Sequence, residues 1–533
     1  MSQTRYISRK MLDVFSSNDQ DLIYHQEKLQ DFIGLPFSLD NIEKQIELKN
    51  ENFSAANREV LCNVLYKEYQ NNKNNSLSLQ QIDLLRNSNT YTVTTGHQLC
   101  LLGGPMYFFL KIVHVINLTQ ILNKTFPDYN FIPVFWMASE DHDSKEIDHL
   151  NLFNKKVEWK HDQSGAVGRF KTQNLDQVFS QLIGLFSDEK AEELKEQFKT
   201  FEGNCYSAAF RNWLHHIFSD KGLLIIDADR KELKEVFKPV LRNELLNSFS
   251  NDCIQQTNRA LEQCNRKIQA HSREINLFYL EKDNRIRIIK QGEEYSIGDK
   301  TMNQAEMMEL LDREIINFSP NAVLRPVYQE TILPNLCYVG GMAELNYWMQ
   351  LKRVFEESSI CFPLIQLRSN LLWIDKNAQN RLNSLEMEVN DIFQESNVLK
   401  QAYLEKNDLQ PFNDASVNEA LASIENSVKE ALDGHKGMDK WVESELKKLN
   451  QSVAQIKSRI LKEKRKSHDQ NLAQIEKIKE KLFPNGNLQE RFQNLLHFCT
   501  TKGYKQRLND LFESIDPLNN DFTILIEENN ESK

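Results

Sequence analysis

TYTVTTGHQLCLLGGPMYFFLK, residues 90–111, is the stretch of sequence that decides the fold. Its first six residues are β-branched or aromatic, which predicts a strand. The strand is followed at once by Gly96, and an apolar run after Pro105 predicts a helix. The stretch is therefore a strand-loop-helix unit, the building block of an α/β fold.

More strands of the same kind are expected farther along the chain. Residues 131–138 (FIPVFWMA) are apolar almost throughout, as in a strand buried on both faces of a parallel sheet. We also expect strands at 223–228, 322–327 and 361–367, since the intervening segments are long enough for helical crossovers. The pattern predicts a doubly wound parallel α/β core over residues 1–375, beginning with N-terminal helices. Residues 155–215 and 230–320 are expected to form inserted connecting subdomains, mainly helical, with a strand-rich piece at 275–297.

The composition changes near residue 375, where Gly and Pro almost vanish. A coiled-coil seam, with apolar residues stepping by four and three, is formed by Val442, Leu446, Leu449, Val453, Ile456 and Ile460. Residues 417–431 repeat the stepping before Gly434-His435-Lys436-Gly437, which predicts an antiparallel helical hairpin turning there. We therefore expect a long antiparallel α-helical coiled-coil arm over 376–482, and a C-terminal segment, 483–533, that returns to the core.

Length and charge limit the classes of protein to consider. A chain of 533 residues exceeds the size of one hydrophobic core, and it holds only 17 Gly and 12 Pro, which favours a globular, helix-rich protein. The formal net charge of -11 argues against a nucleic-acid partner, because such binding needs clustered Lys and Arg. No nucleic-acid partner is expected.

The cysteines and the N-terminus bear on the compartment. The eight cysteines show no C-x-x-C pair, so we expect reduced thiols. The N-terminal residues show no apolar signal region, and the apolar stretch 99–118 is broken by Gly103-Gly104-Pro105 and interrupted by Lys111 and His114. We expect a cytoplasmic protein with no membrane partner.

The first candidate site is Thr95-Gly96-His97-Gln98, with Gly103 and Gly104 in the same loop. A strand that delivers such a loop to a helix N-terminus offers amide N–H groups to an anion, and His97 suits acid or base chemistry. The loop lacks the G-x-G-x-x-G and P-loop patterns of nucleotide sites. A tight turn with a capping histidine is the structural alternative.

The second candidate is Glu140-Asp141-His142-Asp143, directly after a buried strand, where ligands of open α/β sheets bind. General base work, metal binding and recognition of an ammonium group all suit it, whereas a polar helix cap is the alternative. His142 and His149 do not have the spacing of a zinc site, so no metal is expected.

The third candidate includes Arg325, Gln329, Gly340-Gly341 and Glu344, followed by Tyr347 and Trp348. Paired glycines suggest a backbone that approaches a ligand, and Arg325 suits a carboxylate. An ordinary turn with core aromatics explains the same residues equally well.

Two further features carry weaker signals. The segment LFPNGNLQER, residues 482–491, is expected to end a helix. Asn487 and Arg491 within it are candidates for a nucleotide contact. Cys100 and Cys337 lie near the glycine clusters, but their apolar surroundings favour buried thiols over nucleophiles.

Four segments, taken in order, resemble the bacillithiol biosynthesis cysteine-adding enzyme family, BshC. They are TGHQLCLLGGPMYFFLK (95–111), IPVFWMASEDHDSKEIDHL (132–150), LRPVYQETILPNLCYVGGMAELNYW (324–348) and LFPNGNLQER (482–491). The resemblance implies a Rossmann-like core, a coiled coil used for homodimerisation, and a ligase that adds cysteine to glucosaminyl malate. It does not fix the cofactor, but the cysteine carboxylate must be activated, so ATP or another nucleotide is expected.

The candidate residues fall into a catalytic group and a substrate-binding group. The candidate catalytic residues are His97, Glu140, Asp141, His142 and Asp143. The candidate substrate-binding residues are Thr95, Gly96, Gln98, Gly103, Gly104, Arg325, Gln329, Gly340, Gly341, Glu344, Tyr347 and Trp348. Under the implied reaction the carboxylates hold ammonium groups or act as base, and Arg325 binds the malyl carboxylate.

Two other functions remain as alternatives to the ligase. One is a coiled-coil scaffold whose α/β part only binds a metabolite. The other is a nucleotidyltransferase on the same core, which would release pyrophosphate without cysteine.

Overall fold

The computed structural model describes residues 2–153, 155–407, 414–432, 437–466 and 468–527. The chain divides into two compact units. The core unit comprises residues 4–371 and 490–524, and the C-terminal unit comprises residues 1–3, 372–489 and 525–533.

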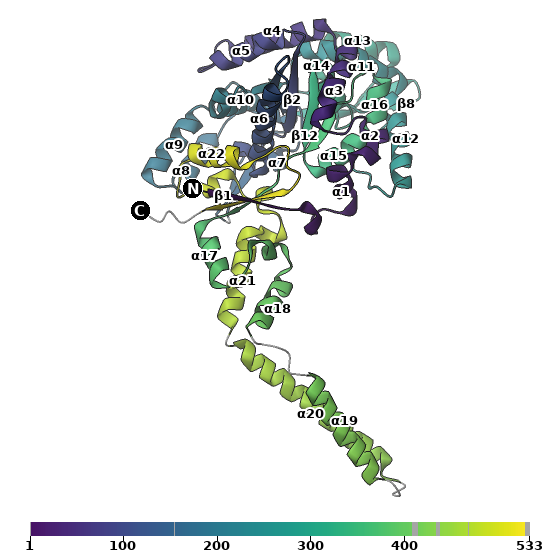
Figure 1. Ribbon diagram of the computed structural model, residues 1–533. Coiled ribbons are helices and arrows are strands. Elements are labelled where there is room, and N and C mark those ends of the chain that lie inside the picture. The colour runs from purple at the N-terminus through teal and green to yellow at the C-terminus, as the bar shows by residue number, and fades with distance from the viewer. Residues whose placement is uncertain (1, 154, 408–413, 433–436, 467, 528–533) are drawn as a thin grey trace. The chain divides into compact units, whose positions relative to one another are not determined.

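A five-stranded parallel sheet forms the centre of the core unit, with the order β13-β12-β2-β3-β6 (Figure 1). Its strands are β2 (Thr90–His97), β3 (Asn130–Met137), β6 (Leu224–Asp227), β12 (Asn335–Gly340) and β13 (Leu364–Leu367). From β2 the chain adds β3 and then β6 on one side, while β12 and β13 lie on the other. This order is that of a doubly wound Rossmann-like sheet, whose switch point lies between β2 and β12.

The sheet is buried on both faces, and its strands consist mainly of apolar and threonine side chains. All eight residues of β2 are buried, and the helix α6 (Tyr107–Thr125) packs against β2, β3 and β12. Val93, Phe131 and Val339 lie in one core cluster with residues of α3 (Ile42–Asn52) and α6. The predicted doubly wound α/β core is confirmed.

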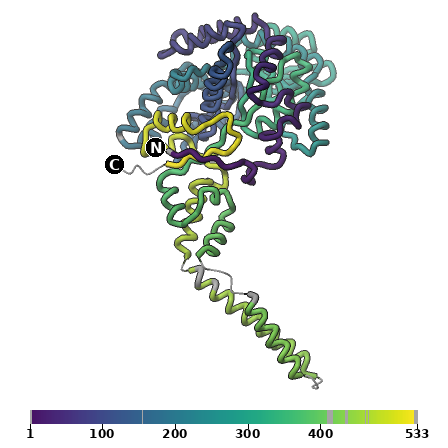
Figure 2. Tube along the Cα trace, in the orientation of Figure 1, coloured from purple at the N-terminus to yellow at the C-terminus, as the bar shows by residue number. Residues whose placement is uncertain are grey.

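The remaining helices of the core unit are α1 (Ser17–Tyr24), α2 (Gln30–Ile33), α4 (Ala55–Tyr69), α5 (Ser76–Leu85), α7 (Ser144–Ile147), α8 (Leu175–Ile183), α9 (Asp188–Lys199), α10 (Tyr206–Phe218), α11 (Lys231–Asn247), α12 (Phe249–Gln263), α13 (Gln304–Glu314), α14 (Leu324–Ile332), α15 (Met342–Gln350), α16 (Lys352–Glu357) and α22 (Tyr504–Ser514). Figure 2 traces these segments by colour along the chain.

A second, antiparallel sheet of five strands lies within the expected insertion, with the order β10-β9-β8-β7-β11. Its strands are β7 (Leu277–Glu281), β8 (Asn284–Gln291), β9 (Glu294–Ile297), β10 (Lys300–Asn303) and β11 (Phe318–Pro320). The strand-rich piece predicted at 275–297 is confirmed. A small hairpin pairs β4 (His149–Leu152) with β5 (Lys155–Glu158).

The prediction of a strand at 322–327 is wrong, because the helix α14 begins at Leu324. The Asn321 side chain accepts hydrogen bonds from the amides of Val323 at 2.9 Å and Leu324 at 3.3 Å, which starts the helix. Pro326 lies in the first turn, where a missing N–H costs no helical hydrogen bond. The sheet strand of this region is instead β12, which begins at Asn335.

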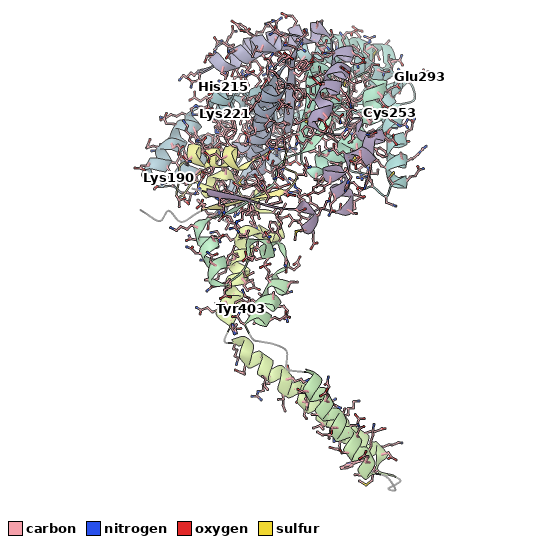
Figure 3. The ribbon with its side chains drawn as sticks, viewed as in Figure 1. Lys190, His215, Lys221, Cys253, Glu293 and Tyr403 are labelled. Carbon is pink, nitrogen blue, oxygen red and sulfur yellow. The ribbon has the colours of Figure 1, made fainter. Side chains whose placement is uncertain are left out.

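The C-terminal unit is helical, as predicted. Its helices are α17 (Lys376–Ser384), α18 (Ser396–Lys406), α19 (Asp414–Ala431), α20 (Asp439–Lys466) and α21 (Asp469–Leu482). The helices α19 and α20 lie side by side (Figure 1), whereas most of the turn expected at Gly434 to Gly437 lies outside the described residues. On α18, Tyr403, labelled in Figure 3, accepts a hydrogen bond from Asn471 of α21 at 2.6 Å.

A third sheet has three strands in the order β1-β15-β14, with β1 (Ser2–Ile7), β14 (Leu371–Ile374) and β15 (Phe522–Glu527). The strand predicted at 522–526 is confirmed as β15. No helix within the described ranges is long and apolar enough to cross a membrane.

Candidate active site

A cavity of about 440 Å³ opens at the carboxyl ends of β2, β3 and β12, which is where the strand order of the parallel sheet reverses. Ligands of open α/β sheets bind at this place, because the strand ends and the loops that follow them diverge there. From the sheet side the cavity is lined by Gly96, His97, Gln98, Trp136, Met137, Ala138, Ser139, Glu140, Asp141 and Tyr338.

Asp141 is held in place by groups from three segments. Its carboxylate accepts hydrogen bonds from Gln98 Nε2 at 2.8 Å and from the amide of His142 at 2.8 Å. Arg285, from β8 of the second sheet, pairs with the Asp141 carboxylate across the cavity, with 3.3 Å between Nη1 and Oδ1. Burial acts to raise the pKa of Asp141, but the hydrogen bonds from His142 and the charge of Arg285 outweigh it and lower the pKa. Asp141 is therefore a fixed, ionised carboxylate.

Glu140 lines the cavity and belongs to a buried ionic network. Lys234 Nζ lies 2.5 Å from Glu140 and 3.1 Å from Asp229, and Arg169 also pairs with Asp229 at 2.7 Å. Burial raises the pKa of Glu140 in spite of Lys234, whereas Lys234 and Arg169 together overcome burial and lower the pKa of Asp229 to about 2. Of the two carboxylates, Glu140 is the stronger base.

Glu344 supplies a third carboxylate, at the start of α15. It accepts a hydrogen bond from the amide of Gly341 at 2.6 Å and pairs with the buried Lys111 at 2.6 Å. Lys111 also donates to the carbonyl of Gly96 at 2.9 Å. Burial opposes ionisation of Glu344, but Lys111 outweighs it and lowers the pKa of Glu344. The pair ties the end of β2 to the loop after β12.

His97 is a neutral imidazole. Burial, with a smaller contribution from Lys111, lowers the pKa of His97 to about 3. Its Nδ1 lies 3.1 Å from the carbonyl oxygen of Gln98, which can only accept, so Nδ1 carries the proton and Nε2 keeps a lone pair. At neutral pH His97 is a hydrogen-bond acceptor rather than a proton carrier.

Arg325 faces the cavity from α14. Its guanidinium donates to Gln329 Oε1 and to the Tyr347 hydroxyl, each at 3.1 Å. Burial would lower the pKa of Arg325, but Tyr347 and the other nearby groups outweigh it, so the pKa is raised and the charge is retained. Arg325 can offer its remaining donors to a carboxylate.

The cavity brings together part of the residues expected from sequence. Its lining includes Gly96, His97, Gln98, Glu140, Asp141, Arg325, Glu344 and Tyr347. The lining does not include Thr95, Gly103, Gly104, His142, Asp143, Gln329, Gly340, Gly341, Trp348 or Arg491. Asn487 belongs to the C-terminal unit.

Several of the residues outside the lining have structural partners. The Thr95 hydroxyl donates to the carbonyl of Val339 at 2.8 Å, and Asp143 caps α7. Trp348 stacks on Tyr338 with ring centroids 4.2 Å apart. Gln329 is fully buried, and its side-chain amide donates to Glu330. These contacts position the strand ends and helices that carry the lining.

The loop with Gly103 and Gly104 is closed rather than open to an anion. The amides of both glycines donate within the loop, at 2.8 and 2.9 Å, and the amide of Met106 donates to the carbonyl of Gln493 at 2.8 Å. A Cβ atom on Gly104 would lie 2.7 Å from the Cys100 side chain. The glycines serve close packing, and the loop does not fit a phosphate group.

Sequence reasoning named Arg325 but missed the other cationic residues of the cavity. Arg273, Arg285 and Arg287 line it from the insertion, together with His271, while Lys111 and Lys234 pair with its carboxylates. Arg285 and Arg287 alternate along β8, so they share one face of the strand. The alternation in the sequence predicts a strand with both arginines on one face. The sequence does not predict that this strand lies opposite the parallel sheet.

The cysteines of the chain are free thiols, including Cys253, labelled in Figure 3. Cys100 and Cys337 are buried, and burial raises the pKa of both thiols. Neither lines the cavity, which argues against a nucleophilic role. Within the described residues, no group of three or more His, Cys, Asp or Glu side chains is placed to hold a metal ion.

The fold and the cavity define a Rossmann-like α/β protein with a ligand site at its switch point. Residues 7–369 match the family model described as bacillithiol biosynthesis BshC, N-terminal Rossmann-like domain. Residues 371–527 match the model described as bacillithiol biosynthesis BshC, C-terminal coiled-coil domain. The chain therefore belongs to the BshC family, and the resemblance noted in the sequence is confirmed.

Curated relatives agree with this assignment over the full length of the chain. A protein of Flavobacterium johnsoniae is 35% identical over 98% of this chain and 99% of its own. Proteins of Flavobacterium psychrophilum and Christiangramia forsetii are each 34% identical, again over 98% of this chain and 99% of the relative. All three carry the name "Putative cysteine ligase BshC".

Proposed function

We propose that this chain is a cysteine ligase that joins the carboxyl group of L-cysteine to the amino group of glucosaminyl malate as an amide. One observation carries the proposal: three carboxylates and several cations converge on one cavity at the switch point of the sheet. An acceptor with an amine and carboxylates, and a donor with an ammonium and a carboxylate, need both signs of charge in one site. The relatives' name, "Putative cysteine ligase BshC", supports a ligase that uses cysteine.

Asp141 is the proposed anchor for an ammonium group. It is ionised, lies at the cavity, and is oriented by Gln98 and Arg285. A carboxylate with a lowered pKa stays charged when a cationic ligand arrives, and charge-assisted hydrogen bonds are the strong ones.

Glu140 is the proposed base for the attacking amine. The amine nitrogen must lose a proton as it forms the bond to the carboxyl carbon of cysteine, and a carboxylate with a raised pKa accepts that proton more readily. Lys234, 2.5 Å away, can stabilise the charged form before the transfer. His97 contributes a neutral acceptor through Nε2 at the end of β2.

Activation of the cysteine carboxylate is proposed to depend on ATP or another nucleotide, which would convert a carboxylate oxygen into a leaving group. The glycine loop at Gly103 and Gly104 does not fit a phosphate of that nucleotide.

The test is to incubate purified protein with L-cysteine and glucosaminyl malate, with and without ATP, and to detect the amide by mass spectrometry. The proposal is supported if the amide forms only when L-cysteine is present. Absence of product with every nucleotide tested would contradict it. Pyrophosphate release without cysteine would instead favour a nucleotidyltransferase.

A homodimer formed through the coiled coil is part of the proposal. Ile424 of α19 is 44% exposed, and Ile456 and Leu449 of α20 are 56% and 37% exposed, although all three belong to the apolar seam. Exposed apolar residues at coiled-coil spacing are typical of a surface that a second helix pair covers. A cytoplasmic location is also proposed, since reduced thiols suit that compartment.

A further inference from the structure

One wall of the cavity carries positive charge from the insertion. Arg285 and Arg287 lie on β8, and Arg273 lies in the segment just before β7. All three line the same cavity that the carboxylates of the parallel sheet face. The wall therefore presents cations to any ligand bound at the switch point.

The carboxylates of the cavity do not neutralise this wall. Glu140 pairs with Lys234, Glu344 pairs with Lys111, and Asp141 pairs with Arg285. Each carboxylate thus has a cation of its own. The charges of Arg273 and Arg287 remain in excess.

Arg273 and Arg287 have no ion pair with a carboxylate in the part of the chain that the structure describes. Arg287 lies over the ring of Phe278, with 5.7 Å between the guanidinium carbon and the ring centroid. A cation–π contact does not require the guanidinium N–H groups as hydrogen-bond donors, so they can serve a ligand. Both side chains are exposed, so they can adjust to a ligand.

We propose that Arg273 and Arg287 form a subsite for a dianionic oxygen group, either two neighbouring carboxylates or a phosphate. In the ligase reaction, on whose assignment this part rests, the group is the malyl end of the acceptor. A planar guanidinium binds two oxygen atoms at once, so two arginines match a group with four or three acceptor oxygens. The amine of the acceptor then points toward the carboxylates on the opposite wall.

This assignment differs from the one expected from sequence, which gave the malyl carboxylate to Arg325. Arg325, on α14, already donates hydrogen bonds to Gln329 and Tyr347. Its side chain is also less exposed than those of Arg273 and Arg287. Within the described residues, the side chains of Arg273 and Arg287 donate no hydrogen bonds of this kind, and they supply two charges rather than one. Arg325 remains available to the carboxylate of cysteine.

The test uses the full chain and calorimetric titration with L-malate, inorganic phosphate and acetate. Arg273→Gln/Arg287→Gln is the variant, and Lys282→Gln is the matched control, because Lys282 lies in the turn of the same hairpin outside the lining. We expect the double variant to weaken binding of the dianion by about tenfold or more, which corresponds to one charge-assisted contact. Lys282→Gln should leave it within about twofold.

Each result has a distinct meaning. Weakened binding of L-malate, with a raised KM for glucosaminyl malate and an unchanged KM for cysteine, supports the subsite and its malyl assignment. Weakened binding of phosphate alone supports the subsite and overturns the malyl assignment. Equal binding by the variant and the wild type overturns the subsite. If the wild type binds L-malate through these arginines but makes no amide, the ligase function fails and the subsite stands.

Discussion

Asp141 and Arg285, which lie 144 positions apart in the sequence, form an ion pair with 3.3 Å between the guanidinium nitrogen and the carboxylate oxygen. Asp141 follows β3 of the parallel sheet, and Arg285 is the second residue of β8 in the inserted sheet. Arg285 also donates to the carbonyl of Pro320 at 3.0 Å, so its guanidinium is fixed at both ends. The pair sets the distance between the two walls of the cavity.

Asp141→Asn should abolish most of the ligase activity without unfolding the protein. The amide keeps the shape of the side chain but removes the charge that would hold an ammonium group, so kcat/KM should fall by about a hundredfold or more. Steady-state kinetics and thermal unfolding measure the two effects. Asp162→Asn removes an exposed carboxylate outside the lining and should change neither. Full activity in Asp141→Asn would remove this residue from the mechanism.

Lowering the pH should destabilise the core unit through two buried histidines. Burial lowers the pKa of His97 to about 3 and that of His114 to about 4, whereas an unfolded histidine titrates near about 6.5. Between these values the unfolded chain binds more protons than the folded chain. The free energy of unfolding must therefore decrease as the pH falls from about 6.5 toward 4.

The expected loss is on the order of 1–2 kcal/mol per histidine at pH 5, measured by urea unfolding at pH 5 and pH 7. His114→Gln should reduce the pH slope whatever it does to stability at pH 7. An unchanged slope in His114→Gln would show that His114 is protonated in the folded state.

The parallel sheet was predictable because its strands carry their own signals. Residues 90–97 and 130–137 are β-branched or apolar and end in polar clusters, so both the strands and the place of the site could be predicted from local sequence. The helix α14 was not predictable in the same way. Its start depends on the Asn321 side chain and on Pro326, two residues that are equally common in turns before strands.

The cationic wall could not be predicted because it depends on a distant contact. Arg285 faces Asp141 only when the inserted sheet packs against the end of β3, and that packing is set by contacts far apart in the chain. At the glycine loop, by contrast, the sequence predicted a ligand contact that the structure does not support. Gly103 and Gly104 lie between a strand and a helix N-terminus, as in an anion-binding loop, but the aromatic side chains of α6 and the side chain of Cys100 fill the space around them.

Glu490→Ala should destabilise the core unit, whereas Arg491→Ala should not. Glu490 is fully buried and pairs with the buried Arg368 at 2.8 Å, while also accepting hydrogen bonds from Asn370 and from the amide of Leu371. Removal of one partner leaves an uncompensated buried charge, which costs about 3 kcal/mol or more. Arg491 is exposed, so its removal should change the free energy of unfolding by about 0.5 kcal/mol at most.

Chemical unfolding of the two variants at the same pH provides the comparison. Similar stabilities for both would contradict the buried ion pair. Because Arg491 is also a candidate nucleotide contact, nucleotide binding by the stable Arg491→Ala variant tests that role separately.

Gly104→Ala should lower stability more than Gly341→Ala. Gly104 has φ +63°, a conformation that alanine rarely adopts, and the new Cβ would lie 2.7 Å from the Cys100 side chain. Strain of this kind costs about 2 kcal/mol or more. Gly341 has φ -76°, and the nearest atom to a Cβ there is Glu344 Oε2 at 3.5 Å, so a loss of about 1 kcal/mol or less is expected. Thermal unfolding measures the loss of stability in both variants, and equal losses would contradict the strain expected at Gly104.

Charges on the exposed seam of the arm should separate the proposed dimer. Ile424 and Ile456 are 44% and 56% exposed, and a partner helix pair would cover them. Burial of one such side chain contributes about 1.5–3 kcal/mol, and a buried glutamate in its place would cost still more. Ile424→Glu/Ile456→Glu should therefore shift the mass measured by light scattering from two chains to one. Ser427→Glu/Ser452→Glu adds the same charge at exposed positions outside the seam and should leave the mass unchanged. A wild-type mass of one chain at every concentration would instead mean that the seam serves only the pairing of α19 with α20.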